Sequence, residues 1–217
     1  LRQKVDFIKD QGPVLESFSY TKFESNNKTT FTQKLLPVYK AIEKTRKNLN
    51  KKKSLISFIG APWTLITYML GLKINKNKIN YSKIKNKGFN IDLILNKLHD
   101  FLCIHIENQI SYGADVVQIF DSWAGLIAPE DLPKYCYIPN QKLVEFCKRK
   151  KIPVICFPKG IKENFKEFNN TVKPDGLNID YDINIEWAKA NLKNTVIQGG
   201  LDPKILLLSE EEIISNA

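Results

Sequence analysis

Hydroxyl and carboxyl side chains stand at or near the ends of several predicted strands, and these groups could do chemistry. Tyr68 lies in a predicted helix that follows one strand, and Ser122 directly follows the strand segment "QIFD". Either hydroxyl could bind a ligand, although such a tyrosine more often packs in a core and such a serine more often closes a turn. Asp121, Asp180 and Asp202 also stand at strand ends, where a carboxylate can cap a helix or take part in acid–base chemistry. For Asp202, in "LDP", we expect a cap.

Histidine and cysteine, the usual ligands of transition metals, are scattered along the chain. His99 and His105 fall on different faces of one predicted helix and cannot act as a pair of ligands. The four cysteines stand apart, with no CxxC pair: Cys103, Cys136, Cys147 and Cys156. No Ser-His-Asp, Cys-His or HExxH pattern is present in the sequence. We therefore expect no metal and no disulfide, and a reducing, cytoplasmic location.

The chain is strongly basic, with a formal net charge of +10. Of its 33 basic residues only Arg2, Arg46 and Arg149 are arginine, and the lysines are spread through the chain instead of forming one stripe. Arginine is the better ligand for phosphate, and it is scarce here, so the pattern is not typical of a nucleic-acid surface. A general preference for Lys, Asn and Ile codons explains the basic charge better. We expect no nucleic-acid partner.

One stretch, residues 54–72, contains no charged side chain and is long enough to span a bilayer. Gly60 and Pro62 interrupt it in the middle, and serine and threonine are scattered through it. A strand followed by a helix that starts near Pro62 explains the interruption, whereas a membrane span does not. We therefore expect no membrane role.

Strands and helices are predicted to alternate from residue 54 onward. The predicted strands lie within residues 54–60, 114–122, 152–160, 174–180 and 194–200. The predicted helices lie within residues 63–72, 91–113, 129–151, 162–168, 184–193 and 209–217, and residues 73–88 form a Lys/Asn-rich loop. Five strand–loop–helix units in a row predict a parallel sheet with helical crossovers.

Two architectures fit such a sheet: an open doubly wound sheet and a closed (β/α)8 TIM barrel. The open sheet usually carries a glycine-rich phosphate loop, and neither GxGxxG nor GxxxxGKS occurs here. Polar or Gly/Pro turns instead follow every strand, as in barrels. Five units cannot close eight strands, so we predict an α/β fold that is an incomplete TIM barrel, in one domain over residues 1–217.

The first fifty residues contain no such unit. Residues 4–18 are predicted to be extended, with a break at Gly12 and Pro13. A helix over residues 37–49 is predicted to begin at Pro37. One face of that helix would carry four residues: Val38, Ile42, Thr45 and Leu49.

Five stretches, taken together in their order and spacing, resemble the uroporphyrinogen decarboxylase family: "FIGAPWTLITYML", "QIFDSWAG", "FPKG", "GLNIDYD" and "QGGLDP". The resemblance implies a (β/α)8 barrel of which the five strands are about the third to the seventh. It implies a carboxy-lyase of haem biosynthesis that removes CO2 from the four acetate side chains of uroporphyrinogen III to give coproporphyrinogen III. It also implies that the reaction needs no metal or organic cofactor, and that the full-length protein is a cytoplasmic homodimer.

The resemblance also assigns substrate-binding residues. Tyr68 matches the substrate-contacting tyrosine of the family's "TYM", and Ser122 matches the serine of its "FDS" motif. Phe120 matches a phenylalanine that lines the pocket, and alternation along a strand would put Phe120 and Ser122 on the same side. "GLNID" keeps Asp180 in register but lacks the tryptophan of the family's commoner "LDW".

Other family motifs have no match in these residues. The arginine-rich loop after the first strand, the aspartate of the second strand and the histidine of the last strand are missing, so we assign no catalytic residue here. The sequence starts at Leu1 and its only methionine is Met69. We therefore expect the central part of a longer enzyme, inactive and prone to aggregate by itself.

Two alternatives remain open from the sequence. One is an inactive, interaction-only barrel fragment. The other is a related corrinoid or thiol methyltransferase, which would bind zinc through histidine and cysteine at strand ends. Cys156 lies in a predicted strand, but no histidine accompanies it.

Overall fold

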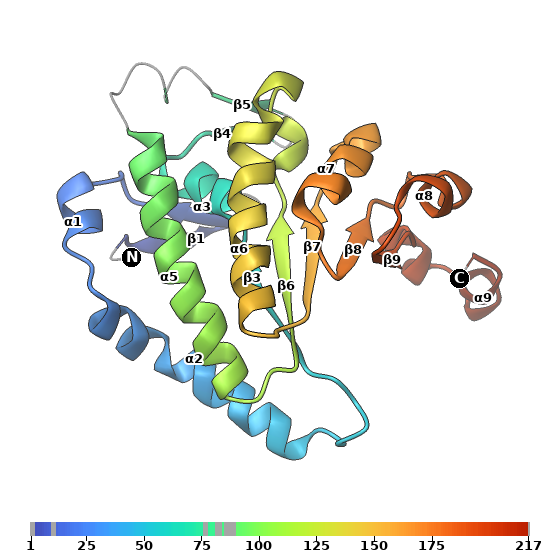
Figure 1. The fold of residues 1–217 in the computed structure, drawn as a ribbon, viewed down its shortest axis with the longest axis horizontal. Coiled ribbons are helices and arrows are strands. Elements are labelled where there is room, and N and C mark those ends of the chain that lie inside the picture. Colours follow the sequence, from blue (N-terminus) through green and yellow to red (C-terminus); the bar gives the residue numbers. More distant parts are fainter. Residues whose placement is uncertain (1–2, 10–11, 76–77, 81–83, 85–89, 217) are drawn as a thin grey trace.

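The computed structural model describes residues 3–9, 12–75, 78–80, 84 and 90–216 and is built around one parallel sheet (Figure 1). Its strands are β3 (Ile56–Gly60), β6 (Val116–Asp121), β7 (Val154–Pro158), β8 (Gly176–Ile179) and β9 (Val196–Gly199). Each lies within a segment predicted to be a strand. Short apolar runs bounded by Gly, Pro and polar residues form such buried strands.

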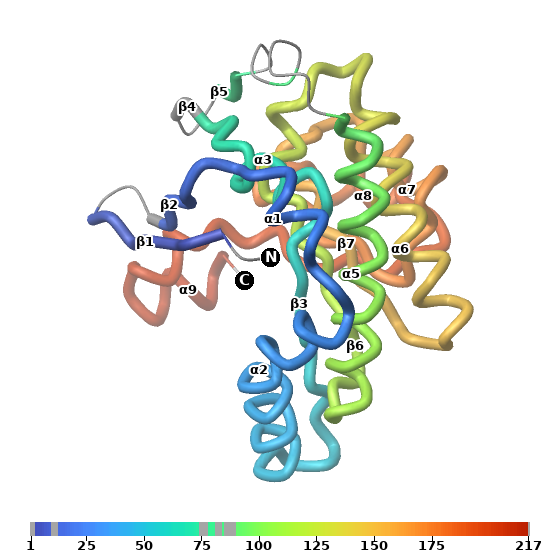
Figure 2. Tube along the Cα trace, turned by 90° about the vertical axis from the view of Figure 1, so that its left-hand side faces the viewer, coloured from blue at the N-terminus to red at the C-terminus, as the bar shows by residue number. Residues whose placement is uncertain are grey.

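The order of the strands distinguishes a barrel from a doubly wound sheet. The order in the sheet, β3-β6-β7-β8-β9, is the order in the chain, and all neighbours are parallel. A doubly wound sheet would reverse direction at a switch point. The long helices α5 (Ile91–Ser111) and α6 (Ile138–Arg149) lie on one side of this sheet (Figures 1 and 2). The prediction of an incomplete (β/α)8 barrel is confirmed.

Further helices follow the other strands. They are α3 (Pro62–Met69), α7 (Phe165–Val172), α8 (Ile185–Asn191) and α9 (Glu210–Asn216), with short 3-10 turns η1 (Ala124–Leu126), η4 (Lys162–Asn164) and η5 (Pro203–Leu207). The uncharged run thus divides into β3 and α3, as predicted. No helix in the described part of the chain is both long and apolar enough to cross a bilayer.

The helix predicted over residues 129–151 is not continuous. It consists of a 3-10 turn η2 (Pro129–Asp131), a π-helical turn η3 (Pro133–Tyr137) and then α6. Pro133 and Pro139 stand near the two junctions, and proline lacks the N–H that an α-helical hydrogen bond requires. The prediction of one helix was therefore wrong in its first half.

The core lies between the sheet and these helices. Side chains that point toward the helices are buried on four neighbouring strands, as shown by Ile59, Ile119, Cys156 and Leu177. Their neighbours point to the opposite face, which the barrel fold turns inward. There Phe58 is 67% exposed, because no described element covers it. Alternation along each strand therefore separates a helix-covered face from an inner face.

The first fifty residues form a hairpin and two helices. Strands β1 (Val5–Ile8) and β2 (Gly12–Leu15) pair antiparallel, and α1 (Tyr20–Glu24) follows. Helix α2 (Lys28–Asn48) begins well before Pro37, so the predicted start was wrong. Asn27 caps α2, because its side chain accepts a hydrogen bond of 2.9 Å from Thr30 N.

Contacts on both sides of Pro37 hold α2 against α5. The rings of Phe31 and Phe101 are 4.8 Å apart, and the Tyr39 hydroxyl lies 3.1 Å from Nδ1 of His105. Tyr39 is fully buried, whereas Val38 is 43% exposed. The predicted apolar face of this helix was therefore wrong at Val38, and also at Thr45, which is exposed. Tertiary packing compensates for the hydrogen bond that proline removes.

Part of the predicted Lys/Asn-rich loop is a small antiparallel ribbon. Its strands are β4 (Lys73–Asn75) and β5 (Lys78–Ile79). In Figure 1 the ribbon lies above the arrowheads of the sheet, on the side to which the strands point. Most of the remaining loop, 81–83 and 85–89, lies outside the described residues.

Candidate functional site

The loops after neighbouring strands are joined by backbone hydrogen bonds at the carboxyl end of the sheet. Ala61 N donates to the carbonyl of Phe120 at 2.9 Å, which joins the loop after β3 to β6. Lys159 N donates to the carbonyl of Asp121 at 3.2 Å, and Gly125 N donates to the carbonyl of Lys159 at 2.8 Å. The segments "GAPWT", "FDSWAG" and "FPKG" therefore form one connected surface.

Two glycines allow these loops to touch. A Cβ on Gly125 would lie 2.5 Å from the carbonyl oxygen of Gly160, far inside van der Waals contact. Gly160 itself has a φ of +81°, a conformation that favours glycine. Its N–H donates a 2.6 Å hydrogen bond to Asp180 Oδ2, whose pKa is raised by burial. Asp180 thus ties the loop after β7 to the end of β8.

Asp121 forms a buried polar cluster beneath this surface. Thr64 Oγ1 donates to Asp121 Oδ1 at 2.8 Å, and Asn140 Nδ2 donates to Asp121 Oδ2 at 3.2 Å. The Asp121 side chain faces the helices, is 1% exposed, and burial raises its pKa to about 6. Asp121 therefore connects β6 with α3 and α6 and is shielded from solvent. This carboxylate therefore positions the strand end that precedes Ser122.

Tyr68 and Ser122 approach the same loop from different elements. Tyr68 is half-buried in the last turn of α3, and its ring lies edge-on to that of Trp123, 6.0 Å away. Ser122 is exposed and directly precedes Trp123. The carbonyl of Trp123 accepts a 3.2 Å hydrogen bond from Nε1 of Trp63, which fixes the loop on α3. We call Tyr68, Phe120, Ser122 and Trp123 the carboxyl-end site.

Phe120 belongs to a row of three rings across neighbouring strands. It lies 5.8 Å from the ring of Phe58 and 6.2 Å from that of Phe157, edge-on to both. Phe120 and Phe157 are register partners in the parallel sheet, so both point to the inner face. Phe58, Phe120 and Phe157, here called the aromatic row, form an apolar surface on the inner face of the sheet. Neither Phe58 nor Phe157 was predicted as a site residue, although strand alternation would place both on the same face as Phe120.

The remaining predicted strand-end carboxylate has a structural role. Asp202 accepts a 3.0 Å hydrogen bond from Lys204 N and is the N-cap of η5, which confirms the predicted cap.

Both histidines lie on α5, on the helix-covered side of the sheet. His105 faces α2, with Nε2 3.0 Å from the side-chain nitrogen of Gln109, and burial lowers its pKa to about 4. His99 Nε2 lies 3.5 Å from Sγ of Cys103.

Burial raises the pKa of the Cys156 thiol well above its ordinary value. Because Cys156 faces the helices, this cysteine gives no support to a zinc-dependent methyltransferase. Within the described ranges, no three His, Cys, Asp or Glu side chains gather as metal ligands.

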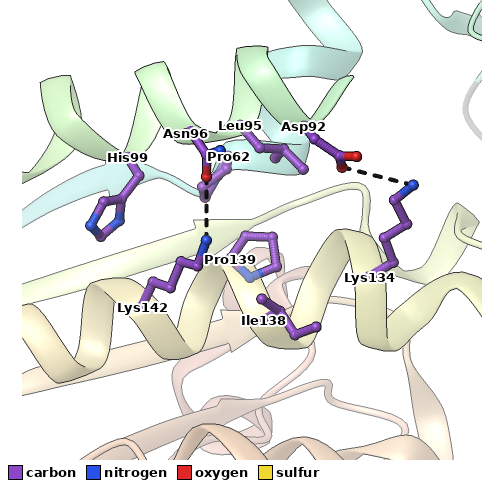
Figure 3. A pocket seen from close by; sticks show the side chains of 9 residues that line it. All are labelled: Pro62, Asp92, Leu95, Asn96, His99, Lys134, Ile138, Pro139 and Lys142. Atoms are coloured by element: carbon purple, nitrogen blue, oxygen red, sulfur yellow. Dashed lines mark hydrogen bonds and ion pairs between the residues drawn. The ribbon is translucent and has the colours of Figure 1, made fainter. Parts of the chain in front are cut away.

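One hollow lies between α5 and α6, on the helix-covered side (Figure 3). It measures about 220 Å³, less than the roughly 300–1,000 Å³ of usual ligand pockets. Lys142 Nζ reaches across it to Asn96 Oδ1 at 3.3 Å, and Lys134 Nζ lies 3.8 Å from Asp92 Oδ1. The basic groups of this hollow thus already have partners on the facing helix, and it is not our candidate site.

The comparisons with known proteins all indicate the same family. The family model described as uroporphyrinogen decarboxylase matches residues 1–217. The chain is 39% identical over 187 residues to the uroporphyrinogen decarboxylase of Orientia tsutsugamushi (strain Boryong), covering 85% of this chain and 55% of that protein. It is 38% identical to the one of Rickettsia bellii (strain RML369-C), over 97% of this chain and 63% of that protein. It is 35% identical to that of Wolbachia sp. subsp. Brugia malayi (strain TRS), over 97% of this chain and 60% of that protein.

The chain thus spans between 55% and 63% of the length of these three relatives. The match extends through both the sheet and the N-terminal hairpin and helices. The chain belongs to the uroporphyrinogen decarboxylase family.

Proposed function

We propose that the protein decarboxylates the acetate side chains of uroporphyrinogen III to give coproporphyrinogen III, and that the carboxyl-end site forms one wall of the substrate pocket. The observation that carries this proposal is the placement of two hydroxyl groups around one loop: Ser122 follows Phe120 by two residues, and the Tyr68 ring contacts that of Trp123. The substrate combines apolar pyrrole rings with polar carboxylates at its edge. An apolar surface with hydrogen-bond donors at the adjoining loop complements both parts.

The chemistry requires an electron sink, and the substrate supplies it. In each step the bond between the acetate methylene and its carboxylate breaks, and CO2 leaves. The bonding electron pair passes into a pyrrole ring that has been protonated next to the acetate. A proton then adds to the methylene carbon and the ring proton is released, which leaves a methyl group. No metal or organic cofactor is required for this balance.

The residues of this chain would bind and orient the substrate. Tyr68 and Ser122 would donate hydrogen bonds to its polar atoms, and Phe120 would contact its rings. Within residues 1–217 we assign no residue as the proton donor or as the group that stabilises the pyrrolium. We further propose that the whole protein is a cytoplasmic homodimer, which its family membership supports.

The test is a direct assay of the whole protein. Uroporphyrinogen III is incubated anaerobically with the protein, and the products are oxidised and separated by their number of carboxyl groups. We expect coproporphyrinogen III to accumulate, with the reaction insensitive to chelators. A relative of known activity serves as the positive control. No loss of carboxyl groups, under conditions in which the control is active, would refute the proposal.

A further inference from the structure

A lysine of the β4–β5 ribbon lies over the carboxyl-end site. Nζ of Lys73 is 4.7 Å from the centre of the Trp123 ring, within the distance of a cation–π interaction. The same indole contacts Tyr68 edge-on. The ammonium group, the indole and the phenol therefore form one cluster, contributed by β4, the loop after β6 and α3.

Two features of this cluster indicate an anionic ligand. Lys73 is exposed and, among the residues that the structure describes, forms no ion pair with a carboxylate. Nε1 of Trp123 is buried and has no hydrogen-bond acceptor within the same part of the chain. A buried donor without a partner is costly, so such groups usually serve a ligand or water. Both groups offer donors and neither offers an acceptor.

The indole ring distinguishes Lys73 from the other lysines of this basic chain. A free lysine side chain loses considerable rotamer entropy when it binds a ligand. The face of Trp123 restrains the Lys73 ammonium beforehand, so less entropy is lost on binding. Of the cation–π contacts in the described residues, only this one involves a ring of the carboxyl-end site; the other three rings are Phe23, Tyr135 and Phe146.

We propose that Lys73 binds a peripheral carboxylate of the tetrapyrrole, with Trp123 holding its ammonium group at the rim of the carboxyl-end site. This inference rests on the proposed function and names an additional contact for the same substrate. A ligand whose rings cover the aromatic row has carboxylates along its edge. The β4–β5 ribbon lies beyond the carboxyl ends of the strands, where such an edge would emerge.

The experiment compares three variants of the whole protein: Lys73→Met, Lys73→Arg and Lys78→Met. Lys78 is the matched control, because it is an exposed lysine of the same ribbon, on β5. The probes are uroporphyrin and coproporphyrin, stable porphyrins with different numbers of carboxylates, and binding is followed by porphyrin fluorescence. We expect Lys73→Met to raise the Kd for uroporphyrin about ten- to a hundredfold, as expected for loss of one charged hydrogen bond. Lys73→Arg should retain most of the affinity, and Lys78→Met should leave it unchanged.

Salt provides a second measurement. The Kd of the unaltered protein should rise more steeply with sodium chloride than that of Lys73→Met, because the variant has lost one screened attraction. If the unaltered protein binds uroporphyrin and turns over uroporphyrinogen, but Lys73→Met has the same Kd and salt dependence, the Lys73 inference is wrong and the proposed function stands. If the unaltered protein neither binds uroporphyrin nor turns over uroporphyrinogen, both are refuted.

Discussion

Asp121 shows how a single buried side chain can organise a site that it does not line. Its carboxylate accepts hydrogen bonds from α3 and α6 at the point where β6 ends. Thr64, one of the donors, stands one helical turn before Tyr68, and Ser122 follows Asp121 in the chain. Asp121 therefore helps to position both segments that carry the proposed substrate-binding hydroxyl groups.

Replacing Asp121 by asparagine should disturb this arrangement. One acceptor oxygen becomes an amide donor that faces the donor group of Asn140, so a buried polar group loses its partner. We expect a loss of about 1–3 kcal/mol in the free energy of unfolding, measured by urea denaturation of the whole protein. Asp182→Asn, the same change at an exposed position after β8, should have little effect. Equal stability of the two variants would contradict the proposed positioning role.

The hydroxyl groups of Tyr68 and Ser122 can be tested individually. Tyr68→Phe and Ser122→Ala each remove a hydrogen-bond donor and should lower kcat/KM for uroporphyrinogen, by about tenfold if each bond contributes as usual. Tyr112→Phe is a suitable control, because the Tyr112 ring lies 5.5 Å from that of Tyr39 at the end of α5. Wild-type kinetics in both site variants would remove the assignment.

Residues of the proposed site differ in whether the sequence alone identifies them. Tyr68, Phe120 and Ser122 were predicted because they stand in motifs that resemble those of a family. Lys73 was not found, since one lysine in a Lys/Asn-rich segment carries no local signal. Its significance comes from the ring beneath it, which is contributed by a residue fifty positions later in the chain. Long-range placement of this kind follows from folding and not from local pattern.

At the scale of elements, strands were easier to predict than helix ends. Apolar runs between Gly and Pro identified all five strands of the sheet. Helix α2 was predicted to start at Pro37 because proline favours a first turn, but the cap at Asn27 and the packing of Phe31 outweighed this local preference. The β4–β5 ribbon was missed because its strands are only three and two residues long.

Because the loops after β6 and β7 touch at Gly125, alanine at this position should reduce stability more than alanine at Gly60. Gly125→Ala would force a Cβ against the backbone of Gly160, which cannot move without breaking the hydrogen bond to Asp180. We expect a loss of about 1–3 kcal/mol in the free energy of unfolding. Gly60→Ala is the matched control, because its Cβ would meet the flexible side chain of Leu65 at 3.1 Å. A thermal shift as large for Gly60→Ala as for Gly125→Ala would show that backbone contact is not the cause.

The junction of α2 and α5 should make stability depend on pH. The ordinary histidine pKa is 6.5, and burial lowers that of His105 to about 4. Between these values the unfolded chain binds a proton that the folded chain does not, so the free energy of unfolding should fall as the pH drops. Asp121 acts in the opposite sense between its ordinary pKa of 3.8 and about 6, because its protonated form is favoured in the folded chain.

Denaturation at pH 7 and pH 5 measures the net effect. His105→Gln should lose less stability between these two pH values than the unaltered protein. Asp121→Asn should lose more, because the opposing titration has been removed. Identical differences in all three proteins would mean that neither group titrates as its burial implies.

At the scale of the whole molecule, the inner face of the sheet and its edges are open. Phe58 and Val196 are 67% and 71% exposed, and within the described residues β3 and β9 each have only one strand neighbour. Open edges and exposed apolar faces favour association.

Residues 1–217 should therefore aggregate. Light scattering should decrease when Phe58 and Val196 are replaced by Gln and Thr. Leu207→Gln is the control, because Leu207 is 86% exposed in η5, outside the sheet. A monodisperse chain would contradict this prediction.

The aromatic row has an electrical consequence for the rim of the site. Ring carbons respond to a field much less than water does, so Phe58, Phe120 and Phe157 form a floor of low dielectric constant. A ligand that lies on this floor displaces water, and the attraction between charges increases as the dielectric constant falls. A carboxylate at the edge of such a ligand would therefore be attracted to the ammonium group of Lys73 more strongly than it would be in water.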